Sequence, residues 1–186
     1  MRTKTEATIE ELYKIREKAE IVNGEIVRMS PTGGLPSWAS GAIFASLKQY
    51  EQESRSGYAF PDNAGFIVNL PNRRSFSPDA AYYLGDPPTS KFLDGAPVFA
   101  AEVRSEEDYG PRAEEEMAAK RVDYFAAGTQ VVWDVDVLRE NCIRVYRQDA
   151  PDQPQVYRRG EVAEAEPALS GWSMPVDDLW PKPRQS

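Results

Sequence analysis

The chain has 186 residues, of which 41% are hydrophobic and 28% charged, a composition typical of soluble globular proteins. It contains no histidine, which excludes histidine-based acid–base chemistry, and its single cysteine excludes an intramolecular disulfide and a cysteine zinc cluster. The net charge of −8 argues against broad non-specific binding to polyanions. Since no apolar run approaches the ~20 residues that span a bilayer and the N-terminus lacks the apolar stretch of a secretory signal, we expect a cytoplasmic protein without a membrane partner.

The first third of the chain predicts a short helix, a hairpin and a long helix. Residues 8–18 open with a capping-box sequence, Thr8 to Glu11, and predict a short helix. Residues 20–29 predict a β-hairpin whose Asn23-Gly24 turn accommodates positive φ. Apolar residues then recur at helical spacing over about 37–53.

The middle of the chain predicts the centre of a sheet. Residues 65–70 and 79–84 predict two strands joined through a turn at 71–74. Residues 97–103 are a short and nearly all-apolar run, which is typical of a central strand covered on both faces.

The remainder predicts one more helix and further strands. Residues 112–127 predict a helix that Gly128 closes. Three strands are expected at 130–135, at 143–147 and, as a weak edge strand, at 155–158. Without internal repeats or a linker, the chain is expected to form a single α/β domain over 1–180 around a mixed sheet, followed by a disordered tail at 181–186.

Two carboxylates and a lysine interrupt this apolar framework. Asp79 stands at the head of a predicted strand, Glu102 interrupts the run at 97–103, and Lys120 lies on the following helix. A buried strand tolerates an ionised carboxylate poorly unless something pairs with it. Two such carboxylates followed by a cation are typical of a divalent metal site with an electrostatic stabiliser beside it.

Each of these residues also has a purely structural interpretation. Asp79 fits a turn, Glu102 fits a buried salt bridge, and Lys120 fits a lysine that extends its ammonium to solvent. Their occurrence together, in order on strand, strand and helix, favours the metal site.

Several short segments together form a pattern that runs almost from end to end. They are Glu20-Ile21-Val22-Asn23-Gly24-Glu25, Met29-Ser30-Pro31-Thr32-Gly33-Gly34, Ser77-Pro78-Asp79-Ala80-Ala81-Tyr82, Glu102-Val103-Arg104-Ser105, Lys120 with Tyr124-Phe125-Ala126-Ala127-Gly128, Val132-Trp133-Asp134-Val135-Asp136, Arg144-Val145-Tyr146-Arg147 and Leu169-Ser170-Gly171-Trp172. By these segments the chain resembles the Uma-type restriction endonuclease family of the PD-(D/E)XK nuclease superfamily. The resemblance implies a restriction endonuclease-like fold, in which helices flank a mixed central sheet with an αβββαβ core, an N-terminal hairpin and C-terminal strands.

The resemblance also implies a set of site residues. Asp79, Glu102 and the backbone carbonyl of Val103 would hold Mg²⁺ or Mn²⁺. Lys120 would be the catalytic lysine of the superfamily, moved from the strand onto the following helix.

Two further positions are expected to assist this site. Arg104 stands where the superfamily motif has its lysine, and it is expected to contact substrate phosphate because a guanidinium stays protonated and cannot act as a base. Glu25 matches an acidic position of the family's first hairpin and is expected to support the site.

The expected function is therefore metal-dependent endonucleolytic hydrolysis of DNA. Two departures from the family pattern leave an alternative open: Pro36 or a neighbour stands where the family has a histidine, and an acidic stretch, Glu106-Glu107-Asp108, follows Ser105. The alternative is a nuclease-fold protein with weakened catalysis that binds nucleic acid or protein. A third interpretation is a structural dimer whose carboxylates pair with Lys120 and Arg104. A homodimer is also expected of the nuclease, although the sequence decides neither the oligomeric state, nor the DNA preference, nor the physiological role.

Overall fold

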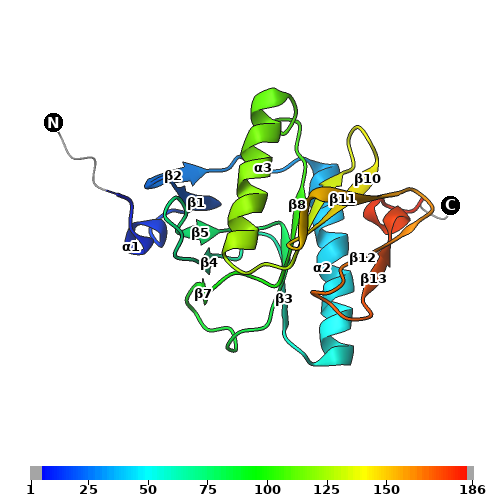
Figure 1. Ribbon diagram of the computed structural model, residues 1–186, viewed down its shortest axis with the longest axis horizontal. Coiled ribbons are helices and arrows are strands. Elements are labelled where there is room, and N and C mark those ends of the chain that lie inside the picture. Colours follow the sequence, from blue (N-terminus) through cyan, green and yellow to red (C-terminus); the bar gives the residue numbers. More distant parts are fainter. Residues whose placement is uncertain (1–5, 184–186) are drawn as a thin grey trace.

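A six-stranded mixed sheet forms the centre of the computed structural model, which describes residues 6–183 (Figure 1). The strands follow the spatial order β11–β10–β9–β8–β6–β3, and of the neighbouring pairs only β8 and β9 are parallel. Their bounds are β3 (Tyr58–Phe60), β6 (Ala80–Tyr83), β8 (Phe99–Val103), β9 (Val131–Asp136), β10 (Cys142–Arg147) and β11 (Ala150–Arg158).

Two helices cover opposite faces of this sheet, as Figure 1 shows on either side of β8. Helix α2 (Gly34–Ser54) buries Ile43 and Leu47 in one core, and α3 (Pro111–Ala126) buries Tyr124 and Phe125 in the other. The chain order α2, β3, β6, β8, α3, β9 is the αβββαβ core expected from the sequence. The mixed α/β fold is thus confirmed.

Strand β8 is the central strand that the apolar run predicts. It pairs with β6 on one side and with β9 on the other, and its alanines are fully buried because small side chains let a helix approach each face closely. Since β6 and β8 are antiparallel neighbours, the start of β6 and the end of β8 lie side by side at the same end of the strands. This topology brings the residues around Asp79 and Glu102 to the same place.

The N-terminal predictions are confirmed apart from one boundary. Helix α1 (Ile9–Leu12) has the capping box, with Thr8 and Glu11 exchanging side-chain-to-backbone hydrogen bonds, but it ends at Leu12 and does not continue to residue 18. The hairpin of β1 (Ala19–Val22) and β2 (Glu25–Arg28) turns at Asn23 and Gly24, which have φ of 51° and 73°.

The segment between the first and second strands of the main sheet differs from the expectation. Of residues 65–70 only β4 (Phe66–Ile67) is a strand, and it belongs to a separate three-stranded sheet with β5 (Ser75–Phe76) and β7 (Leu93–Asp94). The turn at 71–74 therefore leads back into β5, not directly into β6. Strand β3, which is only three residues long, was not predicted.

The C-terminal part completes the core on the α2 side. The expected edge strand at 155–158 is the second half of β11, and it does lie at the sheet edge. Strands β12 (Val162–Glu164) and β13 (Ser173–Pro175) and the short helix η1 (Val176–Leu179) were not predicted; their apolar residues pack into the same core as α2. Residues 181–183 of the expected tail have no regular structure, and 184–186 lie outside the described residues.

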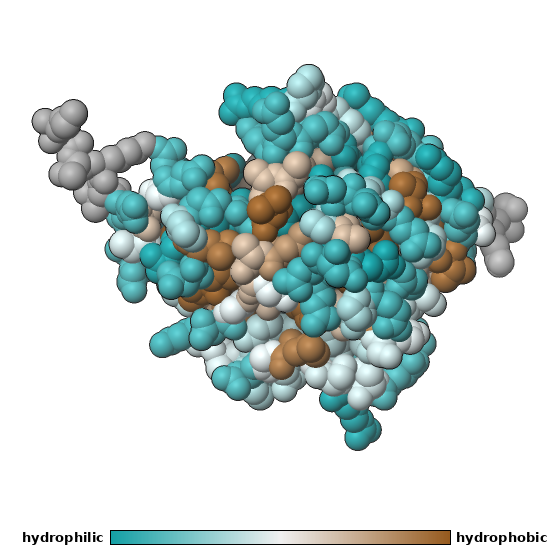
Figure 2. Space-filling model, viewed as in Figure 1, coloured by the Kyte–Doolittle hydropathy of each residue, from teal (hydrophilic) through white to brown (hydrophobic). Residues whose placement is uncertain are grey.

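The molecular surface is mainly polar. On the face in Figure 2, hydrophilic side chains predominate and apolar ones form small separate groups. Within residues 6–183, no helix is both long enough and apolar enough to cross a membrane.

A buried ion-pair network ties the N-terminal hairpin to α3. Arg73, in the turn before β5, lies 2.6 Å from Glu20 of β1 and 2.8 Å from Asp123 of α3, and all three side chains are less than a tenth exposed. A backbone hydrogen bond from Arg74 to Ile21 holds the turn against the hairpin. Arg73 therefore connects Glu20 to α3.

We expect Arg73→Ala to reduce the free energy of unfolding by about 3–5 kcal/mol, because it leaves the buried Asp123 without its cation and Glu20 with Lys120 as its remaining one. Arg74→Ala is the matched control: its side chain is exposed, and the change should stay within about 0.5 kcal/mol. Urea unfolding followed by tryptophan fluorescence measures both, and equal effects of the two substitutions would contradict the role given to Arg73.

Candidate functional site

Asp79 is fixed against the end of β8. Its Oδ2 accepts a hydrogen bond from the Val103 N–H at 2.7 Å, and its own N–H donates to the Ala101 carbonyl at 3.0 Å. The hydroxyl of Ser40 on α2 donates to the Asp79 carbonyl at 2.7 Å. Because the N–H and C=O of one residue in a strand point the same way, the Val103 carbonyl also points towards the side that Asp79 occupies.

Lys120 turns inward from α3 and does not extend to solvent. Its Nζ lies 2.8 Å from Glu102 Oε1 and 2.9 Å from Glu20 Oε1, and its side chain is only 18% exposed. Tyr124 lies one turn later on the same helix face and donates its hydroxyl to Glu102 Oε1 at 2.6 Å. Glu102 thus makes a salt bridge, as its structural interpretation expects, but a partly buried one, and its partner is the lysine of the proposed site.

The first hairpin contributes Glu20 to this cluster. Glu20 is 3% exposed, contacts Lys120, and accepts a hydrogen bond from the Ser77 N–H at 2.8 Å. Glu25, the residue expected from the sequence, lies exposed on β2. The signal for Glu20 was the one used for Glu102: an acid inside an apolar strand, here beside Ile21.

A second lysine enters the site and was not anticipated. Lys18 Nζ lies 2.5 Å from Asp79 Oδ1 and 2.6 Å from Asp62 Oδ1. Lys18 precedes β1, two positions before Glu20, and strand periodicity places such positions on the same side. The two-residue spacing from Glu20 was the feature of the sequence that could have identified Lys18 as a site residue.

The guanidinium of Arg104, expected to contact substrate phosphate, is paired within the protein. Its guanidinium is 5% exposed and makes two hydrogen bonds of 2.7 Å to Asp134. The remaining donors contact both carboxylate oxygens of Glu114 and the Asp108 carbonyl. An arginine has five N–H donors, and these five contacts use them all. Arg104 therefore joins β8, β9 and α3, and it does not pair with Asp79 or Glu102.

The charges of the cluster perturb one another. Burial lowers the pKa of Lys120, but Glu102 and Glu20 outweigh it and the pKa lies above its usual value. Burial raises the pKa of Glu102, and repulsion from Asp79 and Glu20 adds to this against the attraction of Lys120. Burial and the two glutamates also raise the pKa of Tyr124 well above 10. Lys120 is thus a permanent cation and Tyr124 a neutral hydrogen-bond donor.

The donor set fits a hard divalent cation. When all groups are ionised, the two ammonium groups of Lys18 and Lys120 face four carboxylates; Glu20 also contacts Arg73, which it shares with Asp123, so the cluster keeps an excess of negative charge. The four carboxylates are those of Glu20, Asp62, Asp79 and Glu102. Carboxylate and carbonyl oxygens are the ligands that Mg²⁺ and Mn²⁺ prefer. Among residues 6–183 no group of three or more acidic, histidine or cysteine side chains is arranged to hold a metal, so a carbonyl and water would have to complete the coordination.

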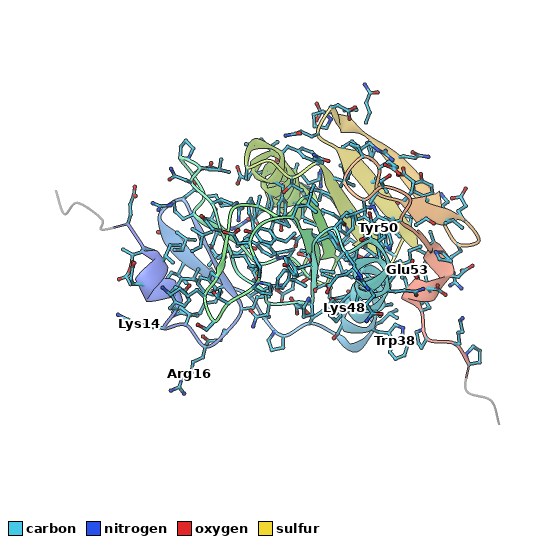
Figure 3. The ribbon with its side chains drawn as sticks, turned by 90° about the horizontal axis from the view of Figure 1, so that it is seen from below. Lys14, Arg16, Trp38, Lys48, Tyr50 and Glu53 are labelled. Atoms are coloured by element: carbon cyan, nitrogen blue, oxygen red, sulfur yellow. The ribbon has the colours of Figure 1, made fainter. Side chains whose placement is uncertain are left out.

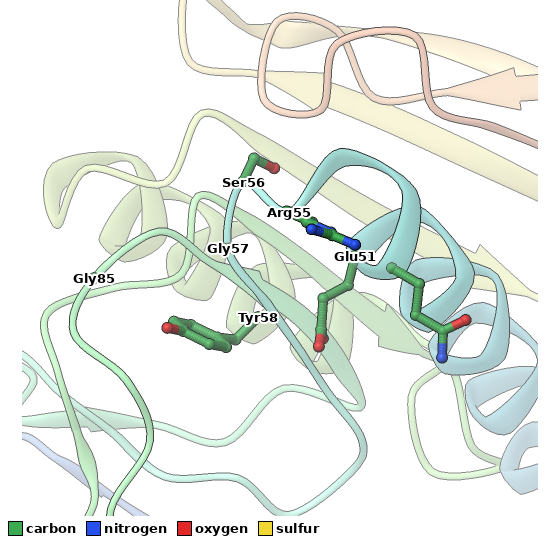
Figure 4. A pocket seen from close by; sticks show the side chains of 7 residues that line it. Glu51, Arg55, Ser56, Gly57, Tyr58 and Gly85 are labelled. Atoms are coloured by element: carbon green, nitrogen blue, oxygen red, sulfur yellow. The ribbon is translucent and has the colours of Figure 1, made fainter.

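A hollow of about 630 Å³ lies away from this cluster (Figure 4). It is lined by residues at the end of α2 and the start of β3, including Glu51 and Arg55, and by Gly85. Gly85 follows β6, whereas Asp79 precedes it, so the hollow and the carboxylate pair lie at opposite ends of this strand. Glu51 is already bonded to Lys48 and to the Ala59 N–H. We assign this hollow no part in the chemistry.

The chain was compared with known families and structures. The Uma2 family, described as "Putative restriction endonuclease", matches residues 8–177. The chain belongs to this family. It is similar in fold to a solved structure from Anabaena variabilis ATCC 29413, titled a "putative nuclease belonging to DUF820", with a TM-score of 0.72 and 19% identity over 93% of this chain and 97% of that chain. The comparison with curated proteins found no match.

We expect Arg104→Ala to lower the free energy of unfolding by on the order of 3 kcal/mol, since it leaves Asp134 buried without its bidentate partner. Arg112→Ala is the control, because Arg112 also pairs with a glutamate but its side chain is 92% exposed; its effect should be below about 1 kcal/mol. Urea unfolding measures both. A stable Arg104→Ala protein with reduced DNA affinity would restore the phosphate-binding role.

Proposed function

We propose that this protein is a divalent-metal-dependent endonuclease that hydrolyses phosphodiester bonds in DNA. The observation that carries the proposal is that Asp79, Glu102 and Lys120 lie together at one end of the central strands β6 and β8, in a chain of the Uma2 family. The net charge of −8 makes a locally neutralised cleft necessary for binding a polyanion. DNA is the partner proposed here, and a homodimer stays a prediction.

Asp79, Glu102 and the Val103 carbonyl would hold Mg²⁺ or Mn²⁺. When bound, such an ion polarises the scissile phosphate and lowers the pKa of an attacking water. Val103 orients Asp79 through its N–H, and Tyr124 orients Glu102 through its hydroxyl. The protein thus holds Glu102 through Oε1, and it holds Asp79 through Oδ2 from Val103 and through Oδ1 from Lys18.

Lys120 would stabilise the negative charge that develops on the phosphate in the transition state. Its raised pKa keeps it protonated near neutral pH, so it serves as a cation and hydrogen-bond donor and not as a general base. Glu20 is the second carboxylate that contacts the ammonium and is proposed as its positioning residue.

The second candidate is a binding module that has lost catalysis. It is favoured by the contact between Lys18 and Asp79, which gives this carboxylate a cation from the chain itself. Capture of a divalent ion at Asp79 distinguishes the two candidates, because a binding module does not need it.

We expect Mn²⁺ or Mg²⁺ to raise the melting temperature of the wild-type protein, because an ion that binds only the folded state stabilises it by mass action. Asp79→Asn should abolish this shift and leave the fold intact. Differential scanning fluorimetry with increasing MnCl₂ measures the effect. An equal shift in the wild type and Asp79→Asn would place the ion elsewhere.

We expect slow, Mn²⁺-dependent nicking of plasmid DNA at low ionic strength, where phosphate attraction is least screened. Lys120→Met should reduce the single-turnover rate at saturating protein by on the order of 10²-fold or more, as loss of a preorganised transition-state donor does. Lys91→Met, which replaces an exposed lysine, is the control and should cut at the wild-type rate. Circular dichroism and retained Mn²⁺ binding would verify that Lys120→Met is folded; full activity of this variant would remove Lys120 from the mechanism.

A further inference from the structure

Lys18 contacts an oxygen of Asp79, a carboxylate that is proposed to bind a metal ion. Asp79 has two oxygens, and Oδ2 is taken by the Val103 N–H at 2.7 Å. The oxygen that remains, Oδ1, lies 2.5 Å from Lys18 Nζ. A divalent ion held by Asp79 and Glu102 would therefore compete with Lys18 for this oxygen.

The charge of Lys18 acts on both proposed ligands. Its ammonium contacts Asp79 directly and is attracted by Glu102. With its side chain 15% exposed, the ammonium is only weakly screened from the cluster. It is therefore a cation at the place where a divalent ion would enter.

Asp62 offers Lys18 a second partner outside the proposed metal site. It lies in the turn after β3, 2.6 Å from Lys18 Nζ, and its side chain is 44% exposed. Because Lys18 contacts both carboxylates at once, it can release Asp79 and keep Asp62 with only a small movement of its flexible side chain.

We propose that Lys18 is a resident counter-ion of Asp79, which a divalent metal must displace, and that Asp62 retains the displaced ammonium. Lys18 and Asp62 then set the metal affinity in opposite directions without coordinating the ion. The inference rests on the proposed function, since it takes Asp79 and Glu102 as the metal ligands. It makes Lys18 and Asp62 positioning residues, and their effect should appear in metal binding without DNA.

Isothermal titration calorimetry of the full chain with MnCl₂ alone tests the proposal. Lys18→Met removes the competitor and should lower the Kd for Mn²⁺ by on the order of tenfold, given the strength of a charge contact at this distance. Asp62→Asn leaves Lys18 with Asp79 as its remaining carboxylate contact and should raise the Kd several-fold. If Lys18→Met folds poorly, Lys18→Gln, which keeps a polar side chain, should change the Kd in the same direction.

The double variant separates displacement from a general charge effect. If Asp62 acts by retaining Lys18, Asp62→Asn should leave the Kd nearly unchanged in the Lys18→Met background. An equal increase in both backgrounds would show a through-space effect and overturn the proposal. Lys14→Met is the matched control, because Lys14 lies on the same segment and points into solvent (Figure 3), and its Kd should equal that of the wild type.

The outcomes also separate this inference from the proposed function. Mn²⁺ binding that Asp79→Asn abolishes, with the same Kd in the wild type and Lys18→Met, overturns the counter-ion role and leaves the metal site intact. Binding by Lys18→Met but not by the wild type supports the counter-ion role in its strongest form. Binding by neither protein overturns both.

Discussion

A continuous network of alternating charges, buried or partly buried, is the constraint on which this structure depends. It runs from Asp123 through Arg73, Glu20 and Lys120 to Glu102, with contacts of 2.6 to 2.9 Å. None of these groups is stable in the protein interior alone, since an unpaired buried charge is strongly destabilising. This network of charges joins four parts of the fold: α3, the turn before β5, strand β1 and strand β8. The fold must therefore assemble these parts together for the charges to be satisfied.

This network explains why an N-terminal hairpin belongs to a site built on the central sheet. Lys120 is held between Glu20 and Glu102, so its ammonium position is defined from two sides. A lysine has a flexible stem and a single charged group, and it needs more than one contact to be fixed. Buried ion pairs of this kind are weak evidence for stability. Their contribution here is the placement of one cation beside a pair of carboxylates.

The sequence was sufficient to predict a helix, strand or turn where a single physical pattern determined it. The apolar run of β8, the Asn23-Gly24 turn and the spacing of α2 each gave the correct element, because burial or backbone geometry alone decides them. It failed for β3, β7 and β12, which are two or three residues long and exist through their pairing with another strand. Strands of this length carry too few residues for periodicity to identify them.

The same distinction applies to the site. Asp79, Glu102 and Lys120 could be named because each interrupts an apolar pattern and the family resemblance gave their order. The pairing of Arg104 could not be predicted, because the sequence does not show that Asp134 and Glu114 take up its donors. Lys18 was missed because its partners, Asp62 and Asp79, are 44 and 61 residues away. Which cation meets which carboxylate is a property of the tertiary fold.

The two edges of the central sheet have a consequence for self-association. Strand β11 is nine residues long and forms one edge, but it contains Pro151 and Pro154, which lack the N–H that a docking strand would need. The opposite edge, β3, offers only three residues. Edges that are interrupted or short resist the addition of a further strand. Two copies of this chain would accordingly have to associate through side-chain surfaces, because neither edge offers the uninterrupted backbone that would fuse two sheets into one.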